Sequence, residues 1–260
     1  MNKLWKEELQ SIIFSITFLT RISLPFELNY NNDLPSRSLK YFSFVGLILG
    51  LILALAYTVL SLFWPPILVA VILLGFYIYL TGAIHLDGLL DSVDGLFSNR
   101  SKEKVLLIMK DSLNGSFATV TAVIYLLLKF TLFYQLQEFN IISALIIFPV
   151  LSRWLVIFAI KFFPRAEKSS LGEGFDYEVS NKDFIISSLL PVFIFLVYLF
   201  YDIISLGVMF GLIIIPLLIT IYVANYTMSK IDGLTGDVYG MINEIGEIII
   251  LLVIFTAYYI

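Results

Sequence analysis

Hydrophobic residues in this chain form long runs that few charges interrupt. Residues 41–86 contain no Asp, Glu, Lys or Arg, and the sequence Trp64-Pro65-Pro66 divides them into two halves. About 20 apolar residues cross the hydrocarbon core of a bilayer, and prolines end or begin helices, so this stretch predicts two transmembrane helices joined by a tight turn. The same criterion predicts seven spans, at about 41–63, 66–86, 116–136, 140–162, 184–200, 203–226 and 245–260.

The composition also indicates an integral membrane protein. Apolar residues make up 60% of the 260 residues, charged residues only 14%, and the mean hydropathy is +0.96. A chain of this length cannot bury so much apolar surface within itself, so the excess faces lipid. We therefore expect one all-α domain, a polytopic helix bundle covering residues 1–260. Residues 4–24 are apolar but interrupted by charges, and they predict an N-terminal interfacial helix, neither a span nor a cleaved signal peptide.

The distribution of basic residues predicts the orientation of the spans. Four long segments carry all but two of the 16 Lys and Arg residues, whereas three short turns carry none. Seven spans place all four segments on one side, and the positive-inside rule makes that side the cytoplasm of a cell (inner) membrane protein. The long segments are 1–40, 87–115, 161–183 and 227–244, and the turns lie near 64–66, 137–140 and 201–202.

The residue types that are rare or missing exclude several functions. The chain has no cysteine, which rules out disulfides, thiolate metal sites and cysteine nucleophiles. It has a single histidine, His85, so a zinc site made of several histidines is excluded as well. With 16 Lys and Arg against 20 Asp and Glu, the net charge is -4, which argues against nucleic-acid binding.

Three aspartates lie together where the second span is expected to end. Asp87, Asp91 and Asp94 follow each other at intervals of four and three residues, so on a helix they share one face. Like charges spaced this way repel by roughly 0.2–0.5 kcal/mol per pair, and a divalent cation would reverse the repulsion. Oxygen ligands without sulfur or nitrogen suit Mg²⁺. The alternative is a solvated helix end whose acids neighbour Lys102 and Lys104.

A second set of acids precedes and enters the last span. Asp237 and Glu244 are seven residues apart on one helix face, and Glu247 follows three residues later. Glycines between them, such as Gly240, permit close approach of another helix or a ligand. The alternative is a helix N-terminus that favours acids through its dipole, which accounts for Asp237 but not for the deeper glutamates. An unpaired carboxylate there is costly, so we expect a partner or an ion.

Basic and hydroxyl side chains between these faces are candidates for binding phosphate. Lys110 and Ser112 precede Gly115, where free backbone N–H groups at the start of the third span suit an anion. Arg165 opens a glycine-containing segment that fits either a substrate loop or an ordinary connection.

Three further polar residues call for separate interpretations. Arg153 lies in the middle of a span and must pair with a buried acid or reach a polar cavity. Lys129 lies nearer the outer surface and is expected to snorkel, so it is left out of the site. His85 adjoins the first aspartate, where it would act as a base or position a carboxylate by hydrogen bonding.

Carboxylates with nearby cytoplasmic basic residues, and no thiol or hydroxyl triad, point to metal-assisted phosphate chemistry in which a substrate, a product or the pathway is associated with the membrane.

The motifs that carry this chemistry occur in an order that resembles one known family. They are Phe18-Leu19-Thr20-Arg21-Ile22 with Leu24-Pro25, Tyr41-Phe42 with Val45-Gly46, Gly82-Ala83-Ile84-His85-Leu86-Asp87-Gly88 with Asp91 and Asp94-Gly95, Met109-Lys110-Asp111-Ser112 with Gly115, Ser152-Arg153, Leu171-Gly172 with Phe175, and Thr235-Gly236-Asp237 with Gly240, Glu244 and Glu247. Over nearly its whole length the chain resembles the adenosylcobinamide-GDP ribazoletransferases, the cobalamin synthases. It departs from their pattern at Leu113-Asn114, Ser170 and Gly233-Leu234, none of which removes an acid.

The resemblance implies a reaction and a set of roles. The expected reaction joins adenosylcobinamide-GDP to α-ribazole or its 5′-phosphate, releases GMP, and completes cobalamin. The implied Mg²⁺ ligands are Asp87, Asp91, Asp94 and Asp237, helped by Glu244 and Glu247. The implied phosphate-binding residues are Lys110, Ser112, Arg153 and Arg165, with His85 or one of the acids accepting the hydroxyl proton.

Other functions stay open at this point. A CDP-alcohol phosphotransferase also uses spaced aspartates, but its Asp-Gly-x-x-Ala-Arg signature is not matched after Asp94-Gly95. A cation-coupled transporter would place acids deep within several spans and show internal symmetry. A purely structural scaffold would leave the aspartates without a reason. The sequence leaves open whether the acceptor is phosphorylated and whether the chain forms a homo-oligomer.

Overall fold

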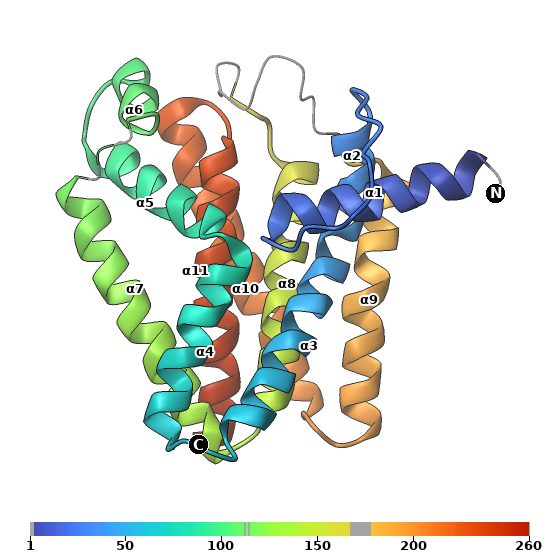
Figure 1. Cartoon of the computed structure of the whole chain (residues 1–260). Helices are drawn as coiled ribbons and strands as arrows, with labels where there is room; N and C mark the ends of the chain where they lie inside the picture. Colours follow the sequence, from blue (N-terminus) through green and yellow to red (C-terminus); the bar gives the residue numbers. More distant parts are fainter. Residues whose placement is uncertain (1–2, 112, 114, 167–177, 260) are drawn as a thin grey trace.

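The computed structural model describes residues 3–111, 113, 115–166 and 178–259, and these residues form a helical bundle with shorter helices across one end (Figure 1). An isolated β-bridge joins Arg165 to Leu234. The α-helices are α1 (Lys3–Leu19), α2 (Leu34–Ser38), α3 (Phe42–Leu60), α4 (Pro66–Thr81), α5 (Ile84–Phe97), α6 (Lys102–Ile108), α7 (Ser116–Gln135), α8 (Ile141–Phe162), α9 (Asn181–Phe200), α10 (Leu206–Ile231) and α11 (Gly236–Tyr259).

The predicted polytopic membrane bundle is confirmed. Among the described residues, six helical segments are long and apolar enough to span a membrane: α3 with its N-terminal extension, α7, α8, α9, α10 and α11. The count becomes seven, as predicted, if α4 and α5 form one broken span. The interfacial prediction for the N-terminus fits α1, which is not among these spans and lies across the end of the bundle (Figure 1).

Two of the predicted boundaries that differ from the structure affect the position of the acidic residues. The second span was expected at 66–86, but α4 ends at Thr81 and the chain turns by 88° before α5. Gly82 and Ala83 make this turn in the left-handed region, with φ of +63° and +59°. The turn was missed because apolar residues continue through it. The last span, expected at 245–260, begins at Gly236, so Glu244 and Glu247 lie inside it.

The long connections gather at one end of the bundle. Helices α1, α2, α5 and α6 lie at this end, and the turns after α3, α7 and α9 lie at the other (Figure 1). This is the arrangement that the basic residues predict. The assignment of the long-connection end to the cytoplasm stays a prediction of the positive-inside rule.

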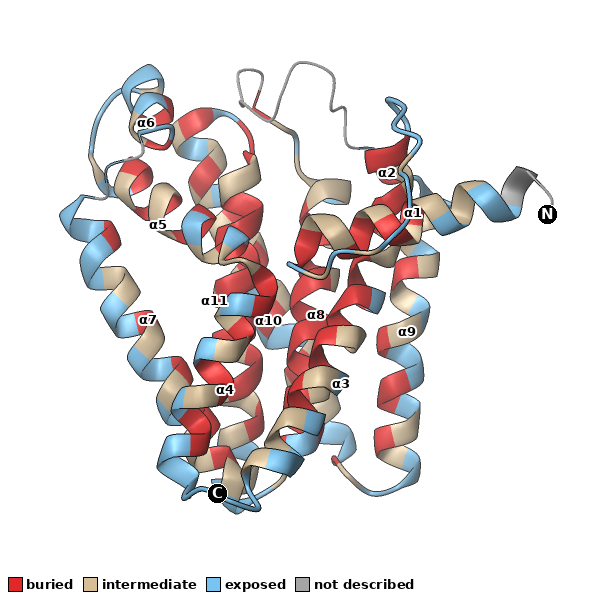
Figure 2. Ribbon diagram, in the orientation of Figure 1, coloured by how far each residue is buried: buried red, intermediate tan, exposed pale blue. Residues whose placement is uncertain are grey.

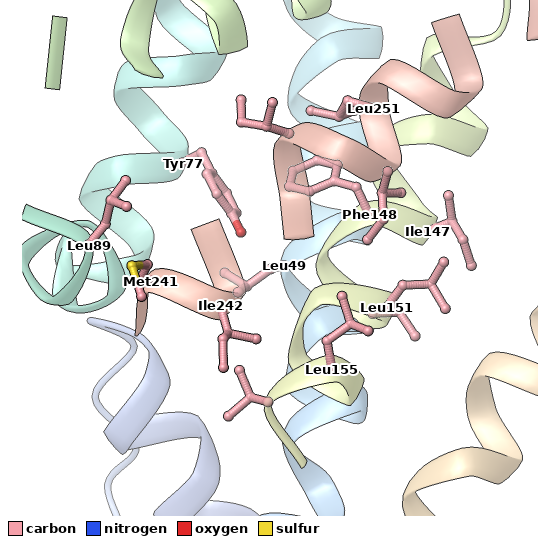
Figure 3. Close-up of a cluster of buried hydrophobic side chains, with 14 of the residues drawn as sticks. Leu49, Tyr77, Leu89, Ile147, Phe148, Leu151, Leu155, Met241, Ile242 and Leu251 are labelled. Carbon is pink, nitrogen blue, oxygen red and sulfur yellow. The ribbon is translucent and has the colours of Figure 1, made fainter. Parts of the chain in front are cut away.

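Burial increases from the outer helices toward α8 and α11. Buried positions concentrate on these two central helices, while the outward faces of α7 and α9 are exposed (Figure 2). Large apolar side chains such as Leu55, Leu196 and Leu218 are at least 60% exposed, which is the surface expected to face lipid. Inside the bundle, Tyr77 from α4, Phe148 from α8 and Leu251 from α11 lie in one apolar cluster (Figure 3).

Glycine allows α3 to lie directly against the backbone of α8. A Cβ atom added at Gly50 would lie 2.8 Å from the Cα atom of Ile146 and 2.8 Å from the carbonyl oxygen of Leu145. Real Cβ atoms do not approach backbone atoms so closely, so the two helices would have to separate. Small residues at such contacts are the usual basis of helix association in membranes.

We predict that Gly50→Ala lowers the midpoint of thermal unfolding of the protein in detergent micelles, because overpacking a tight helix contact costs about 1–3 kcal/mol. Gly75→Ala is the matched control, since an added Cβ there meets nothing within 4 Å. The control is expected to unfold at or above the wild-type midpoint. Equal midpoints for the two variants would contradict the proposed packing.

Candidate active site

The turn after α4 places the aspartates of α5 against the beginning of α11. A Cβ atom added at Gly88 would lie 2.7 Å from the carbonyl oxygen of Asp237, and one added at Gly240 would lie 2.9 Å from the carbonyl oxygen of His85. No side chain can therefore separate the two helices here. The close helix approach predicted from the glycines is found at Gly240, and it brings Asp87 to the same place as Asp237.

The negative charges of the aspartates act on one another. Burial, together with the charges of Asp87, Asp237 and Asp94, raises the pKa of the Asp91 carboxyl to about 6. The four aspartates from two distant parts of the chain thus form one electrostatic cluster, which we call the aspartate cluster. Its repulsion is what a divalent cation would relieve.

The aspartate cluster has the donor chemistry that Mg²⁺ requires, because its ligating atoms are all carboxylate oxygens. Within the described part of the chain, however, no three His, Cys, Asp or Glu side chains converge as a ready-made metal site. The unrelieved repulsion on Asp91 is the observation that fits a bound cation. Asp87 is exposed, and Asp91 and Asp237 are only partly buried, so all three carboxylates are accessible.

Asp94 has a second partner that the sequence did not reveal. Its carboxylate accepts hydrogen bonds from the backbone N–H groups of Gly115 and of Ala118, the latter at 2.9 Å, at the start of α7. The anion expected at this helix N-terminus as a substrate phosphate is therefore a side chain of the protein itself. Ser112, also predicted to bind phosphate, lies outside the described residues.

A cavity of about 150 Å³ opens beside the aspartate cluster. Asp87, Asp237, His85 and Tyr239 form its polar side. His85 is 8% exposed, and burial together with the charge of Arg153 lowers the pKa of its imidazole to about 3. The imidazole is thus neutral and a weak base, whereas the raised pKa of Asp91 lies closer to that of an effective general base.

Two of the predicted phosphate-binding residues lie near the aspartate cluster. Lys110 is exposed, and its charge interacts with the Asp237 carboxylate. Arg165 is held at the start of α11 by the bridge to Leu234, and its charge reaches the hydroxyl group of Tyr239 on the cavity wall. Both cations are placed where an anionic substrate would approach the carboxylates.

The remaining predicted site residues lie deeper, in a buried charge network that joins four helices. Arg153 is fully buried, and its Nη1 atom lies 3.0 Å from Oε1 of Glu247. Of the two alternatives left open for Arg153, the structure has the pairing with a buried acid. A role for this guanidinium in binding a substrate phosphate stays a prediction. Lys129 also pairs with Glu247 and lies 3.4 Å from Oε2 of Glu244.

The expectation that Lys129 snorkels toward the outer surface is wrong. Its side chain is 1% exposed, because α7 turns this residue toward α11 and not toward lipid. A single sequence does not show which way a lysine in a span faces, although Lys129 and Arg153 are the only basic residues outside the four long segments. Their position outside those segments was the signal in the sequence that these two residues differ from the other basic residues.

Tyrosines complete the network. Tyr77 of α4 donates its hydroxyl hydrogen to Glu247, and Tyr125 of α7 donates to Glu244. Asn243 donates to Glu247 at 3.0 Å. Both glutamates predicted as metal ligands thus have protein partners. Glu247 lies about 15 Å along α11 from Asp237, at 1.5 Å per residue. The buried charge network is therefore separate from the aspartate cluster, although both include residues of α11.

We predict that Lys129→Met strongly destabilises the folded protein in detergent, by about 3–5 kcal/mol, because it leaves two buried carboxylates facing one cation. Adding Glu244→Gln to this variant leaves one buried carboxylate, Glu247, paired with one buried cation, Arg153. The double variant is expected to recover part of the lost stability. Lys182→Met, at an exposed lysine, is the control. Thermal unfolding measures all three, and a Lys129→Met protein as stable as the control would rule out the network as described.

Comparisons with known proteins identify the family. The model of the cobalamin-5-phosphate synthase family matches residues 11–255. An adenosylcobinamide-GDP ribazoletransferase of Desulfitobacterium hafniense (strain Y51) is 38% identical, over 100% of this chain and 98% of its own. Proteins of the same name from Clostridium novyi (strain NT) and Caldanaerobacter subterraneus subsp. tengcongensis are 36% and 34% identical, over 95% and 94% of this chain and 97% and 96% of theirs.

No solved structure matches the chain. The family model and the relatives extend over nearly all of its residues, and they confirm the resemblance found in the motifs. The chain therefore belongs to the cobalamin-5-phosphate synthase family.

Proposed function

We propose that this protein is a membrane transferase that joins adenosylcobinamide-GDP to α-ribazole or its 5′-phosphate, giving adenosylcobalamin or its 5′-phosphate and GMP. The observation that carries the proposal is the packing of α5 on α11, which places Asp87 and Asp91 beside Asp237 next to a cavity. Full-length relatives bear the name of this activity. The reaction would take place at the cytoplasmic end of the bundle.

The side chains at this end divide the chemistry between them. A ribose hydroxyl of the acceptor forms a bond to the phosphorus of the adenosylcobinamide phosphate, and the bond from that phosphorus to GMP breaks. Lys110 and Arg165 hold the pyrophosphate by charge-assisted hydrogen bonds. One of the aspartate carboxylates accepts the hydroxyl proton.

Mg²⁺ is the cofactor that fits this donor set. Asp87, Asp91 and Asp237 would hold it, with Asp94 contributing from its position at the start of α7. When bound, the ion neutralises the pyrophosphate and lowers the pKa of the attacking hydroxyl. Glu244 and Glu247 take no part in this assignment, because their charges are met by Lys129 and Arg153.

The rival functions lack this kind of support. A cation-coupled transporter needs carboxylates within the spans that exchange their ion, but Glu244 and Glu247 are tied to basic side chains and tyrosines. A CDP-alcohol phosphotransferase is disfavoured by the family membership and by the missing signature. A scaffold gives no reason for repelling aspartates at a helix contact.

The test is incubation of the purified full-length protein with adenosylcobinamide-GDP and an acceptor, with and without Mg²⁺, while GMP release is measured. Both α-ribazole and its 5′-phosphate are supplied in separate reactions. GMP and a cobalamin product are expected only with Mg²⁺, and the faster acceptor identifies the physiological form. No product with either acceptor would overturn the proposal.

We predict that Asp91→Asn lowers the rate of GMP release at least 100-fold and leaves the unfolding midpoint at or above that of the wild type. The reason is that the substitution removes a proposed metal ligand while also relieving the repulsion in the aspartate cluster. Asp202→Asn is the control, at an exposed aspartate at the other end of the bundle. Near-normal activity of Asp91→Asn would remove this residue from the mechanism.

A further inference from the structure

The cavity beside the aspartate cluster has one polar side and several apolar walls. It lies between α1, the start of α3, the start of α5, the end of α8 and the start of α11. Its polar side carries the two carboxylates of Asp87 and Asp237. The apolar walls are Phe18, Leu39, Phe42, Ile84, Val156 and Ile160. A ligand that fills it must therefore have an apolar end and an end that reaches the carboxylates.

The apolar walls include two aromatic rings that lie nearly parallel. The rings of Phe18 and Phe42 have centroids 6.2 Å apart and planes inclined by 26°. Phe18 belongs to the interfacial helix α1, whose end is fixed to the bundle because the backbone N–H of Arg21 donates to the carbonyl oxygen of Leu80 at 2.7 Å. The cavity wall is thus a built part of the fold. Aromatic walls of this kind suit a flat ring.

The polar side also offers a hydrogen-bonding group with no partner in the protein. His85 is 92% buried, lines the cavity, and its Nδ1 atom makes no hydrogen bond. Buried polar atoms are normally paired, and the residue that carries this unpaired atom is one of those that line the cavity. An imidazole nitrogen can form a hydrogen bond with a single ring nitrogen or hydroxyl group of a ligand.

We propose that this cavity binds the flat, largely apolar aromatic base of the acceptor nucleoside and directs the acceptor's ribose toward Asp87 and Asp237. The inference rests on the proposed function and adds to it the part of the site that recognises the acceptor. His85 is then a binding residue for the base, and α1 contributes to acceptor recognition through Phe18.

The other parts of the two substrates fit the cavity less well. The guanine of the donor carries an amide and an amino group. With Asp87 and Asp237 holding Mg²⁺ as proposed, the apolar walls would leave those groups without hydrogen bonds at a cost of about 1–3 kcal/mol each. The corrin macrocycle is far larger than a cavity of about 150 Å³. A lipid chain gains nothing from the carboxylates of Asp87 and Asp237. A second cavity of about 120 Å³ has more apolar walls, which include Trp154, Pro191 and Val192.

The deciding experiment fills the cavity and measures the two substrates separately. In full-length protein reconstituted in liposomes, Ile160→Trp is expected to raise the KM for the acceptor at least tenfold and to leave the KM for adenosylcobinamide-GDP within twofold. Val192→Trp makes a similar enlargement at the wall of the second cavity and is expected to leave both KM values within twofold. An unchanged acceptor KM in Ile160→Trp, or an equal rise in both KM values, overturns the inference.

A measurement on the wild-type protein covers the case in which Ile160→Trp fails to fold. Free benzimidazole is expected to inhibit competitively against the acceptor and not against the donor, and adenine, a ring system of the same size with a polar amino group, at least tenfold more weakly. Inhibition competitive with the donor, or inhibition by decane but not by benzimidazole, overturns the inference. If the wild-type protein releases no GMP with any acceptor, the proposed function itself is wrong. If the protein does release GMP but these inhibition patterns are absent, only the proposed base site is wrong.

Discussion

A carboxylate inside a membrane bundle is tolerated only when positive charge and hydrogen-bond donors meet it, and Glu247 of α11 meets both conditions. Lys129 from α7 and Arg153 from α8 approach it from two sides, and Tyr77 from α4 donates a hydrogen bond. These contacts fix the position of α11 relative to three other helices. Because Asp237 lies at the beginning of the same helix, the buried network also determines where the candidate active site begins.

The second constraint is the sharp turn at Gly82 and Ala83. Without it, α4 would continue outward and carry Asp87 and Asp91 away from the bundle. With it, α5 lies across the end of the bundle, and its glycine face packs on α11. The energetic consequence is an unrelieved repulsion among carboxylates that come from distant parts of the chain. Proteins keep such a concentration of like charge at functional sites, where it binds a cation or takes part in catalysis.

Much of this architecture could be predicted from the sequence, because lipid imposes a strong and local rule on hydrophobic length. The number of spans, the common side of the long connections and the two acidic helix faces all followed from it. The rule says nothing about which face of a span turns inward, so the burial of Lys129 was missed. It also cannot reveal contacts between distant residues, such as the one between Asp94 and the start of α7. The turn after Thr81 was hidden because the apolar run continues beyond it.

The buried network has a consequence for a protein in an energised membrane. Moving one elementary charge across a potential of 100 mV involves about 2.3 kcal/mol, so an isolated ion within the spans would be pulled toward one leaflet. Lys129 and Arg153 stand beside Glu244 and Glu247, and with all four ionised their charges cancel. In that state the electric field across the bilayer exerts no net force on the network.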